Sequence, residues 1–351
     1  MIDIIVYHII ICKLLKIKYP KYIKNFRIMQ ILLQWHISNF GIISGIVGFK
    51  TNKYSNLLYL FLYVLFHSLT IHYIIIKYFR IKYIFNLSQR PLKKYFFPVI
   101  TNVYWYFSTY FKMYLFLPLI NKGLSLIYKG ELGIIILSLI GILFIWKDLM
   151  SPNPGEFCSG RSTETLLVYF IIGAFIGKYY LNDKNNKNLF YYLLLMIIFS
   201  SASYISYYLM FYKGTNKCKL ILRKIFYNGT NSIAMIIQSI SIILIFIKIN
   251  YKKSIAKFIS FFGSLSFSAY IIHTHLNLRY KILPYLFKNF SSSLSFHNVV
   301  ILLIIQGTLF FIVCALIDYI RFIVFSILRI RQICIYFEKI IFSLCNKINE
   351  K

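Results

Sequence analysis

The sequence is short of charge. Charged residues make up only 14% of its 351 positions, against about 25% in an ordinary soluble chain. Hydrophobic residues make up 59% and aromatic residues 19%. This leaves too little polar surface to coat a water-soluble globule, and the aromatic content is too high for a disordered chain. The composition therefore predicts an integral, multi-pass membrane protein, in which one helical domain takes up the whole length.

Acidic residues are scarcest of all. Nine Asp and Glu residues stand against 40 Lys and Arg, which gives a formal net charge of +31. In a soluble protein such an excess would suggest nucleic-acid binding. Here the positive residues lie mostly between apolar runs, as the flanks of membrane spans do, and AT-rich coding also raises the lysine content. We therefore expect the lipid bilayer, and no nucleic acid, to be the partner of this charge.

Several common motifs are missing as well. None of the six cysteines forms a Cys-x-x-Cys pair, so no zinc or thioredoxin-like motif is visible. The sequence has no P-loop, dinucleotide fingerprint, zinc-protease helix or Gly-x-Ser-x-Gly elbow. His273 and His275 would point to different sides of a helix, which makes them a poor metal pair. We expect no metal and no tightly bound cofactor.

Apolar runs of membrane-spanning length are what the sequence does contain. A bilayer core about 30 Å thick takes about 20 apolar residues in a helix. This predicts an all-α bundle of about ten transmembrane helices over residues 1–326, and a basic amphipathic tail over 327–351 along the membrane surface. The predicted spans are 1–12, 28–49, 54–76, 102–121, 132–146, 165–180, 189–212, 232–248, 258–277 and 299–326.

The first predicted span is too short to cross a bilayer alone. It begins at Met1 in the middle of an apolar run. Either the helix is a half-span, or the true start lies upstream. We expect the second, with a first helix that is truncated in this sequence.

Polar residues inside spans are costly, so each is a candidate for function. The His8 imidazole can take up and return a proton near neutral pH, although a neutral histidine bonded to a neighbouring helix is the alternative. Ser44 and Gly45 form a small-residue step, which either exposes backbone to a ligand or only lets helices approach closely. Asp318 and Arg321 are three residues apart and are expected to form a structural pair.

Two further spans carry polar groups at helical spacing. Trp105 suits an interfacial aromatic belt, and Lys112 is deep enough to need a partner or a route to the interface. Ser266, Tyr270 and His273 share a helix face, either as part of a site or as a polar helix end among the headgroups. The residues that share a face of the other span are Tyr110, Tyr114, Pro118 and Asn121.

Four of these stretches, in this order, resemble a known family. They are Ile4–His8, Ile42–Gly45, Trp105–Asn121 and Ser266–His275. The chain resembles the membrane-bound acyltransferase family 3, whose members typically O-acetylate sugars and other small hydroxyl compounds. The run Tyr169–Lys178 also looks like a span of this family. Two departures stand out: Ile46 follows Gly45 where the family has Phe or Tyr, and the family's first-helix arginine would lie before Met1.

The resemblance implies a membrane enzyme that moves an acyl group, with acetyl as the family's usual one, from acyl-CoA to a hydroxyl of a carbohydrate or glycolipid. It implies His8 as the general base. A transporter or flippase for a lipid-linked sugar remains an alternative, although no internal repeat is evident, and so does a catalytically decayed relative. The residues expected to bind the substrate or acyl donor are Ser44, Gly45, Trp105, Tyr110, Lys112, Tyr114 and His273.

Overall fold

Nearly all of the backbone is helical in the structure, which is a computed structural model. Helices make up 87% of the described residues and no strand occurs among them, so the predicted all-α class is confirmed. In an apolar surrounding a helix satisfies each backbone N–H and C=O within its own segment, which is why such a sequence folds this way. The structure describes residues 5–6, 20–33, 35–78, 93–146, 162–181, 188–212, 226, 232–276, 278–279 and 294–349.

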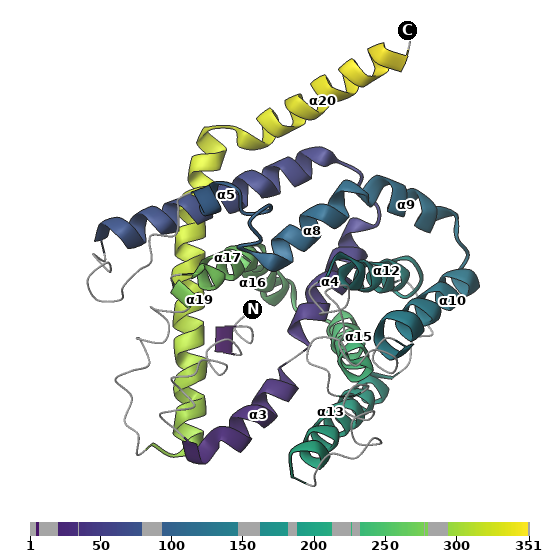
Figure 1. Cartoon of the computed structure of the whole chain (residues 1–351), viewed down its shortest axis with the longest axis vertical. Coiled ribbons are helices and arrows are strands. Elements are labelled where there is room, and N and C mark those ends of the chain that lie inside the picture. The colour runs from purple at the N-terminus through teal and green to yellow at the C-terminus, as the bar shows by residue number, and fades with distance from the viewer. Residues whose placement is uncertain are drawn as a thin grey trace. The chain divides into compact units, whose positions relative to one another are not determined.

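The chain divides into two compact units, whose helices are labelled in Figure 1. The first unit comprises Met1–Tyr19, Lys53–Tyr114 and Lys253–Lys351, and the second comprises Pro20–Asn52 and Leu115–Lys252. The described helices of the first unit are α5 (Tyr54–Tyr78), α7 (Lys93–Phe96), α8 (Trp105–Leu115), α16 (Lys253–Ser264), α17 (Ser266–Thr274), α19 (Phe296–Ile327) and α20 (Ile330–Asn349). Those of the second are η1 (Pro20–Tyr22), α3 (Ile23–Leu32), α4 (His36–Gly48), α9 (Leu117–Leu126), α10 (Lys129–Ile140), the π-helix η2 (Gly141–Trp146), α12 (Thr163–Tyr179), α13 (Leu189–Tyr212) and α15 (Ile233–Lys248).

Four of the described helical segments are long and apolar enough to cross a membrane. They are Tyr54–Ile75, Leu189–Leu209, Lys253–Thr274 and Phe296–Ile327. Ser38–Gly48 and Ile233–Lys248 are shorter apolar helices. These lengths and compositions support a membrane protein, and the count of about ten spans stays a prediction. The short first span lies outside the described residues, apart from Ile5 and Val6.

Three predicted spans are interrupted by a break. Pro118 explains one of them, because proline has no N–H and is tolerated only in the first turn of a helix, where it stands in α9. A break without a proline separates α16 from α17 at Leu265, inside the apolar segment Lys253–Thr274. The interrupted spans are 28–49, now α3 and α4; 102–121, now α8 and α9; and 258–277, now α16 and α17.

The break before α4 is held by hydroxyl groups. Ser38 donates from its Oγ to the Trp35 carbonyl oxygen at 3.0 Å, and Ser239 of α15 donates to the same oxygen at 3.2 Å. A carbonyl released from a helix in an apolar interior is costly unless another group bonds it. The Trp35 carbonyl is not released in this way, because it also accepts the Asn39 N–H of α4 at 3.2 Å. The two serine hydroxyls add to that backbone bond, and the Ser239 bond ties α15 to the break before α4.

Helices α4 and α12 approach each other at backbone distance, and glycine makes this possible. A Cβ on Gly45 would lie 2.0 Å from the Phe170 carbonyl oxygen, and a Cβ on Gly173 would lie 1.9 Å from the Ile42 carbonyl oxygen. No larger residue fits at either position without movement of the backbone. Both helices carry the small-residue spacing that repeats on one helix face, Gly41 with Gly45 and Gly173 with Gly177.

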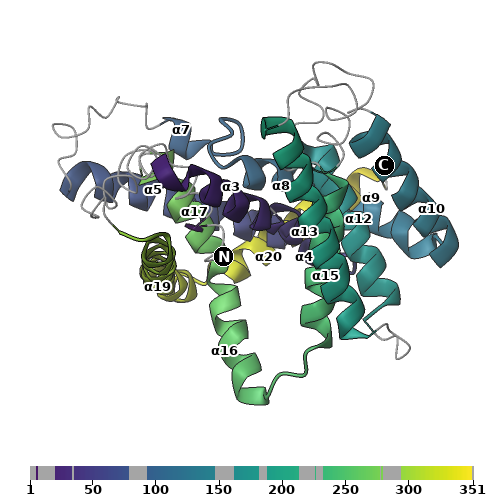
Figure 2. The same ribbon diagram turned by 90° about the horizontal axis from the view of Figure 1, so that it is seen from below.

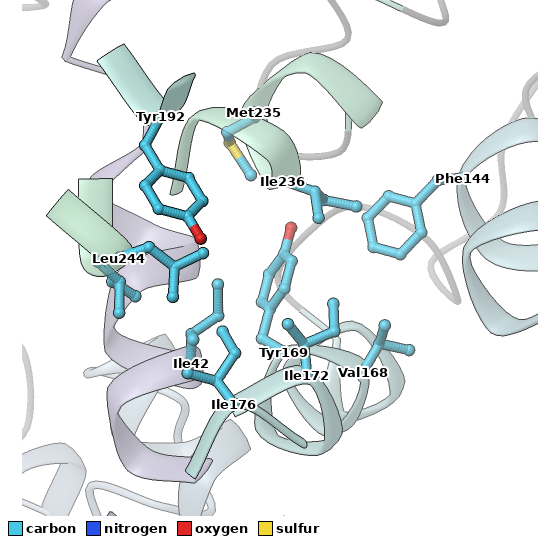
Figure 3. Close-up of a cluster of buried hydrophobic side chains, with 11 residues drawn as sticks. Ile42, Phe144, Val168, Tyr169, Ile172, Ile176, Tyr192, Met235, Ile236 and Leu244 are labelled. Carbon is cyan, nitrogen blue, oxygen red and sulfur yellow. The ribbon is translucent and has the colours of Figure 1, made fainter. Parts of the chain in front are cut away.

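The apolar core of the second unit surrounds this contact. Helices α13 and α15 lie side by side in Figures 1 and 2, and α15 also packs on α4. Figure 3 shows the ring of Tyr169 rising from α12 toward Ile236 of α15 and Phe144 of η2, with 6.0 Å between the two ring centroids. The buried cluster comprises Ile42, Phe144, Val168, Tyr169, Ile172, Ile176, Tyr192, Met235, Ile236, Ile243 and Leu244.

The glycine contact predicts opposite outcomes for two Gly→Ala substitutions. Gly173→Ala should lower the free energy of unfolding by about 1–3 kcal/mol or more, because the new methyl group meets the α4 backbone. Gly133→Ala in α10 is the matched control: its Cβ would meet nothing within 4 Å, and alanine favours a helix by about 1 kcal/mol. Thermal unfolding of the purified protein in detergent measures both, and equal midpoints would contradict the close contact.

Candidate functional site

The structure describes Ser44 and Gly45, two of the predicted binding residues, but not the predicted base His8. His8 lies outside the described residues, so its surroundings stay a prediction. Ser44 and Gly45 lie in α4, with Ser44 partly exposed and Gly45 packed on Phe170. Close helix packing, one of the two interpretations of this step, is therefore observed at Gly45, and ligand binding there stays a prediction.

An aromatic row follows α8 in the first unit. The Tyr106 ring centroid lies 5.7 Å from that of Trp105 and 6.4 Å from that of Tyr110, and Tyr110 lies 5.7 Å from Tyr114. Rings at such separations attract one another beyond their area of burial. The spacing of four residues places the three tyrosines on one helix face. Three predicted binding residues, Trp105, Tyr110 and Tyr114, are thus neighbours.

Polar groups near the end of α8 have distinct surroundings. The Tyr114 side chain is buried, and its hydroxyl donates to the Lys53 carbonyl oxygen at 3.1 Å, just before α5 begins. Lys112 is exposed on the same helix, so its ammonium does not need a buried partner. Tyr114 therefore holds the residue just before α5 against α8. The Lys112 ammonium is exposed and available to a ligand.

Asn121, on the predicted polar face that ends in α9, holds the chain after α4. Its Nδ2 lies 3.0 Å from the carbonyl oxygens of Gly48 and Thr51 and 3.0 Å from Oδ1 of Asn52. Gly48, whose carbonyl also accepts the Thr51 N–H at 2.9 Å, is the last residue of α4, and Thr51 and Asn52 follow it. The role of Asn121 in the structure is thus to close this helix end.

Tyr270 connects the late helix α17 to α8. Its hydroxyl accepts the Tyr106 backbone N–H at 3.2 Å, and the two ring centroids are 5.9 Å apart. That N–H belongs to the first turn of α8, where backbone donors have no partner within the helix. His273 lies one turn after Ala269, is fully buried, and places Nδ1 2.6 Å from the Ala269 carbonyl oxygen. The structure therefore brings Tyr270 of the late predicted span to the aromatic row of α8, whereas His273 contacts Ala269 and Tyr270 of its own helix α17.

His72, Tyr95 and His275, which come from three separate segments of the first unit, form a cluster of rings. The Tyr95 ring of α7 lies 4.1 Å from the His72 ring of α5 and stacks on His275 at 4.8 Å. His275 has no exposed surface, and neither of its ring nitrogens has a hydrogen-bond partner among the described residues. His273 and His275 have different neighbours. No local pattern links residues so far apart, so this cluster could not be read from the sequence.

A buried ionic network joins α5 and α19. Asp318 accepts from Arg321 Nε at 2.7 Å and Nη2 at 3.1 Å, so the predicted pair is confirmed. His67 Nε2 lies 2.9 Å from the same carboxylate. Arg321 also donates to the Tyr59 hydroxyl at 3.0 Å, and its guanidinium lies 4.2 Å from the Tyr63 ring centroid.

The network is almost entirely withdrawn from solvent. His67 and Asp318 have 0% of their surface exposed and Arg321 has 5%. Charges in such a place are costly unless each is paired and hydrogen-bonded, and the planar guanidinium fork meets the carboxylate with two bonds. Because His67 and Tyr59 belong to α5, the same bonds fix α5 against α19.

Removal of one charge from this network should cost more than removal of the pair. Asp318→Leu leaves the Arg321 charge buried and unpaired, so we expect a loss of about 3–5 kcal/mol of unfolding free energy. The double variant Asp318→Leu with Arg321→Met should lose clearly less than the sum of the two single variants. Thermal or denaturant unfolding in detergent measures this cycle, and simple additivity would show that the two residues do not interact.

The geometry gives an aromatic and hydroxyl-rich row on α8, in contact with Tyr270 of α17. Among the described residues, no three or more His, Cys, Asp or Glu side chains gather in a group that could hold a metal ion. A protein-family model described as an acyltransferase domain matches residues 1–319. The chain belongs to the acyltransferase 3 family.

Membership of the acyltransferase 3 family confirms the resemblance and makes the protein a membrane acyltransferase. The matched range contains every residue predicted for the site, from His8 to His273. It ends within α19, so α20 lies outside the matched domain. Neither the curated proteins nor the solved structures contain a match to this acyltransferase.

Proposed function

We propose that this acyltransferase moves an acyl group, with acetyl as the expected one, from acyl-CoA to a hydroxyl of a carbohydrate or glycolipid. The observation that carries the proposal is the family match over residues 1–319. The partly exposed rings of Trp105 and Tyr110 support it, because aromatic side chains with a few polar groups are typical of sites that bind small molecules. Ser44 and Gly45 keep their proposed part in binding substrate or acyl donor.

The proposed reaction needs a base and a donor for negative charge. The acceptor hydroxyl oxygen attacks the thioester carbonyl carbon while His8 takes the hydroxyl proton. A new C–O bond forms, the C–S bond breaks, and the proton passes to the departing CoA thiolate. The negative charge that builds on the carbonyl oxygen needs hydrogen-bond donors. We propose the Tyr110 hydroxyl for this role. Lys112 lies two residues further along α8 and therefore on a different side of the helix, so we propose its exposed ammonium for binding the acyl donor.

The first test of the proposal is the loss of the base. His8→Ala should lower acyl transfer by about 10²–10⁴-fold, the usual contribution of a positioned general base. The measurement follows labelled acetyl from acetyl-CoA into sugar or lipid in membranes that contain the protein. His297→Ala is the matched control, because this histidine is exposed at the start of α19.

The outcomes of this test separate the alternatives. Equal amounts of product from His8→Ala and the unchanged chain would support an acyltransferase but show that His8 is not its general base. No product from a folded protein with any acyl-CoA would favour a decayed relative. Flux of a lipid-linked sugar without an acylated product would favour a transporter.

The second test removes one proposed donor. Tyr110→Phe keeps the ring in the aromatic row and deletes only the hydroxyl. If that hydroxyl stabilises the transition state, kcat should fall by about 10²–10³-fold while KM changes little. Tyr128→Phe, at a tyrosine with 76% of its surface exposed, controls for loss of a phenol elsewhere. An unchanged kcat in Tyr110→Phe would remove Tyr110 from the mechanism.

A further inference from the structure

A groove with a volume of about 280 Å³ lies between α5, α8 and α20 of the first unit. Among the described residues that line it, only Ser55 and Glu338 are neither apolar nor aromatic. Phe61 of α5 and Phe111 of α8 face each other in its wall, with ring centroids 6.0 Å apart. Phe337 of α20 lines it while 50% of its surface stays exposed, so the groove is open along α20.

Helix α20 brings positive charge to this groove. Among the α20 residues whose side chains the structure describes, 330–346, the charged ones are the cations Arg331 and Lys339 and the anion Glu338, and Arg329 directly precedes the helix. Arg331 lies one turn before Cys334, on the helix face that continues through the groove-lining Glu338 and Ile341. The apolar groove therefore has a cation at one end of its α20 wall.

The surroundings of the groove decide what fills it. Tyr54–Ile75 of α5, which forms one wall, is apolar and long enough to cross a membrane. Helix α20 carries exposed large apolar residues, such as Tyr336 at 65% and Ile341 at 58%, beside its lysines and arginines. A cationic helix with such a surface is typical of the boundary between headgroups and hydrocarbon. An open apolar groove at that depth meets lipid chains rather than water.

We infer that this groove holds one acyl chain of an anionic phospholipid of the bilayer, with the headgroup phosphate at Arg331. The apolar lining matches the hydrocarbon chain, and the excess of cations on α20 matches the anionic headgroup. The inference does not rest on acyl transfer: it assigns a lipid site to a helix outside the family domain, and a structural role to the lipid.

The test counts bound lipid on the full chain. The protein is reconstituted in vesicles of phosphatidylcholine and phosphatidylglycerol, extracted in mild detergent and weighed with its lipids by native mass spectrometry. The unchanged chain should retain one phosphatidylglycerol that Leu58→Trp loses, because the larger ring fills the groove. Ile335→Trp adds the same ring at an exposed α20 position outside the groove and should retain the lipid. Arg331→Gln should lower the preference for phosphatidylglycerol about fivefold.

Phe337→Glu and competition with a long-chain acyl-CoA test the same groove in two further ways. Phe337→Glu places a charge in the groove from a half-exposed position, so it tests the site even if Leu58→Trp fails to fold. Equal retention of phosphatidylglycerol by folded Phe337→Glu and the unchanged chain would overturn the inference. Displacement of the retained lipid by a long-chain acyl-CoA, one for one, would also overturn it, because the groove would then belong to the acyl donor.

Discussion

In helices as apolar as these, a buried polar group has to find its partner inside the protein, because neither lipid nor a dry core supplies one. The Trp35 carbonyl at the break before α4 accepts the Asn39 N–H and two serine hydroxyls, one of them from α15. The Tyr106 amide at the start of α8 is bonded by the Tyr270 hydroxyl. The Asp318 carboxylate is bonded by Arg321 and His67. Each of these bonds also fixes one helix against another, so the same constraint that costs energy gives the bundle its register.

Where polar partners are absent, the helices are held by close approach instead. The α4–α12 contact has no ion pair among the described residues, and its tightness comes from glycine on both sides. Lipid is as apolar as a leucine side chain, so apolar area alone gives little drive for association. Shape then matters more than hydrophobicity, and a single methyl group at Gly45 or Gly173 would separate the two backbones.

Polar bonds between helices support the surface that we propose for acyl transfer. In the first unit the ionic network ties α5 to α19, and Tyr270 ties α17 to α8, which leaves the aromatic row of α8 on a rigid support. Loose positioning of reacting groups is costly in rate, and rigid elements reduce that cost. Helix α20 follows α19 beyond the family domain, and lipid bound in the groove would add a further contact to α5.

The sequence by itself determined the features that depend on one helix at a time. These are the all-α class, the apolar segments, the Asp318–Arg321 pair three residues apart, and the shared face of Tyr110 and Tyr114. Helical periodicity fixes such neighbours wherever the helix lies. The tertiary structure decided the rest: the breaks before α4 and α17, the His67–Asp318 bond across 251 residues, and the stacking of His275 on Tyr95. Many of these helices are apolar on every side, so composition does not say which face meets which partner, and only packing selects the rotation and register of each helix.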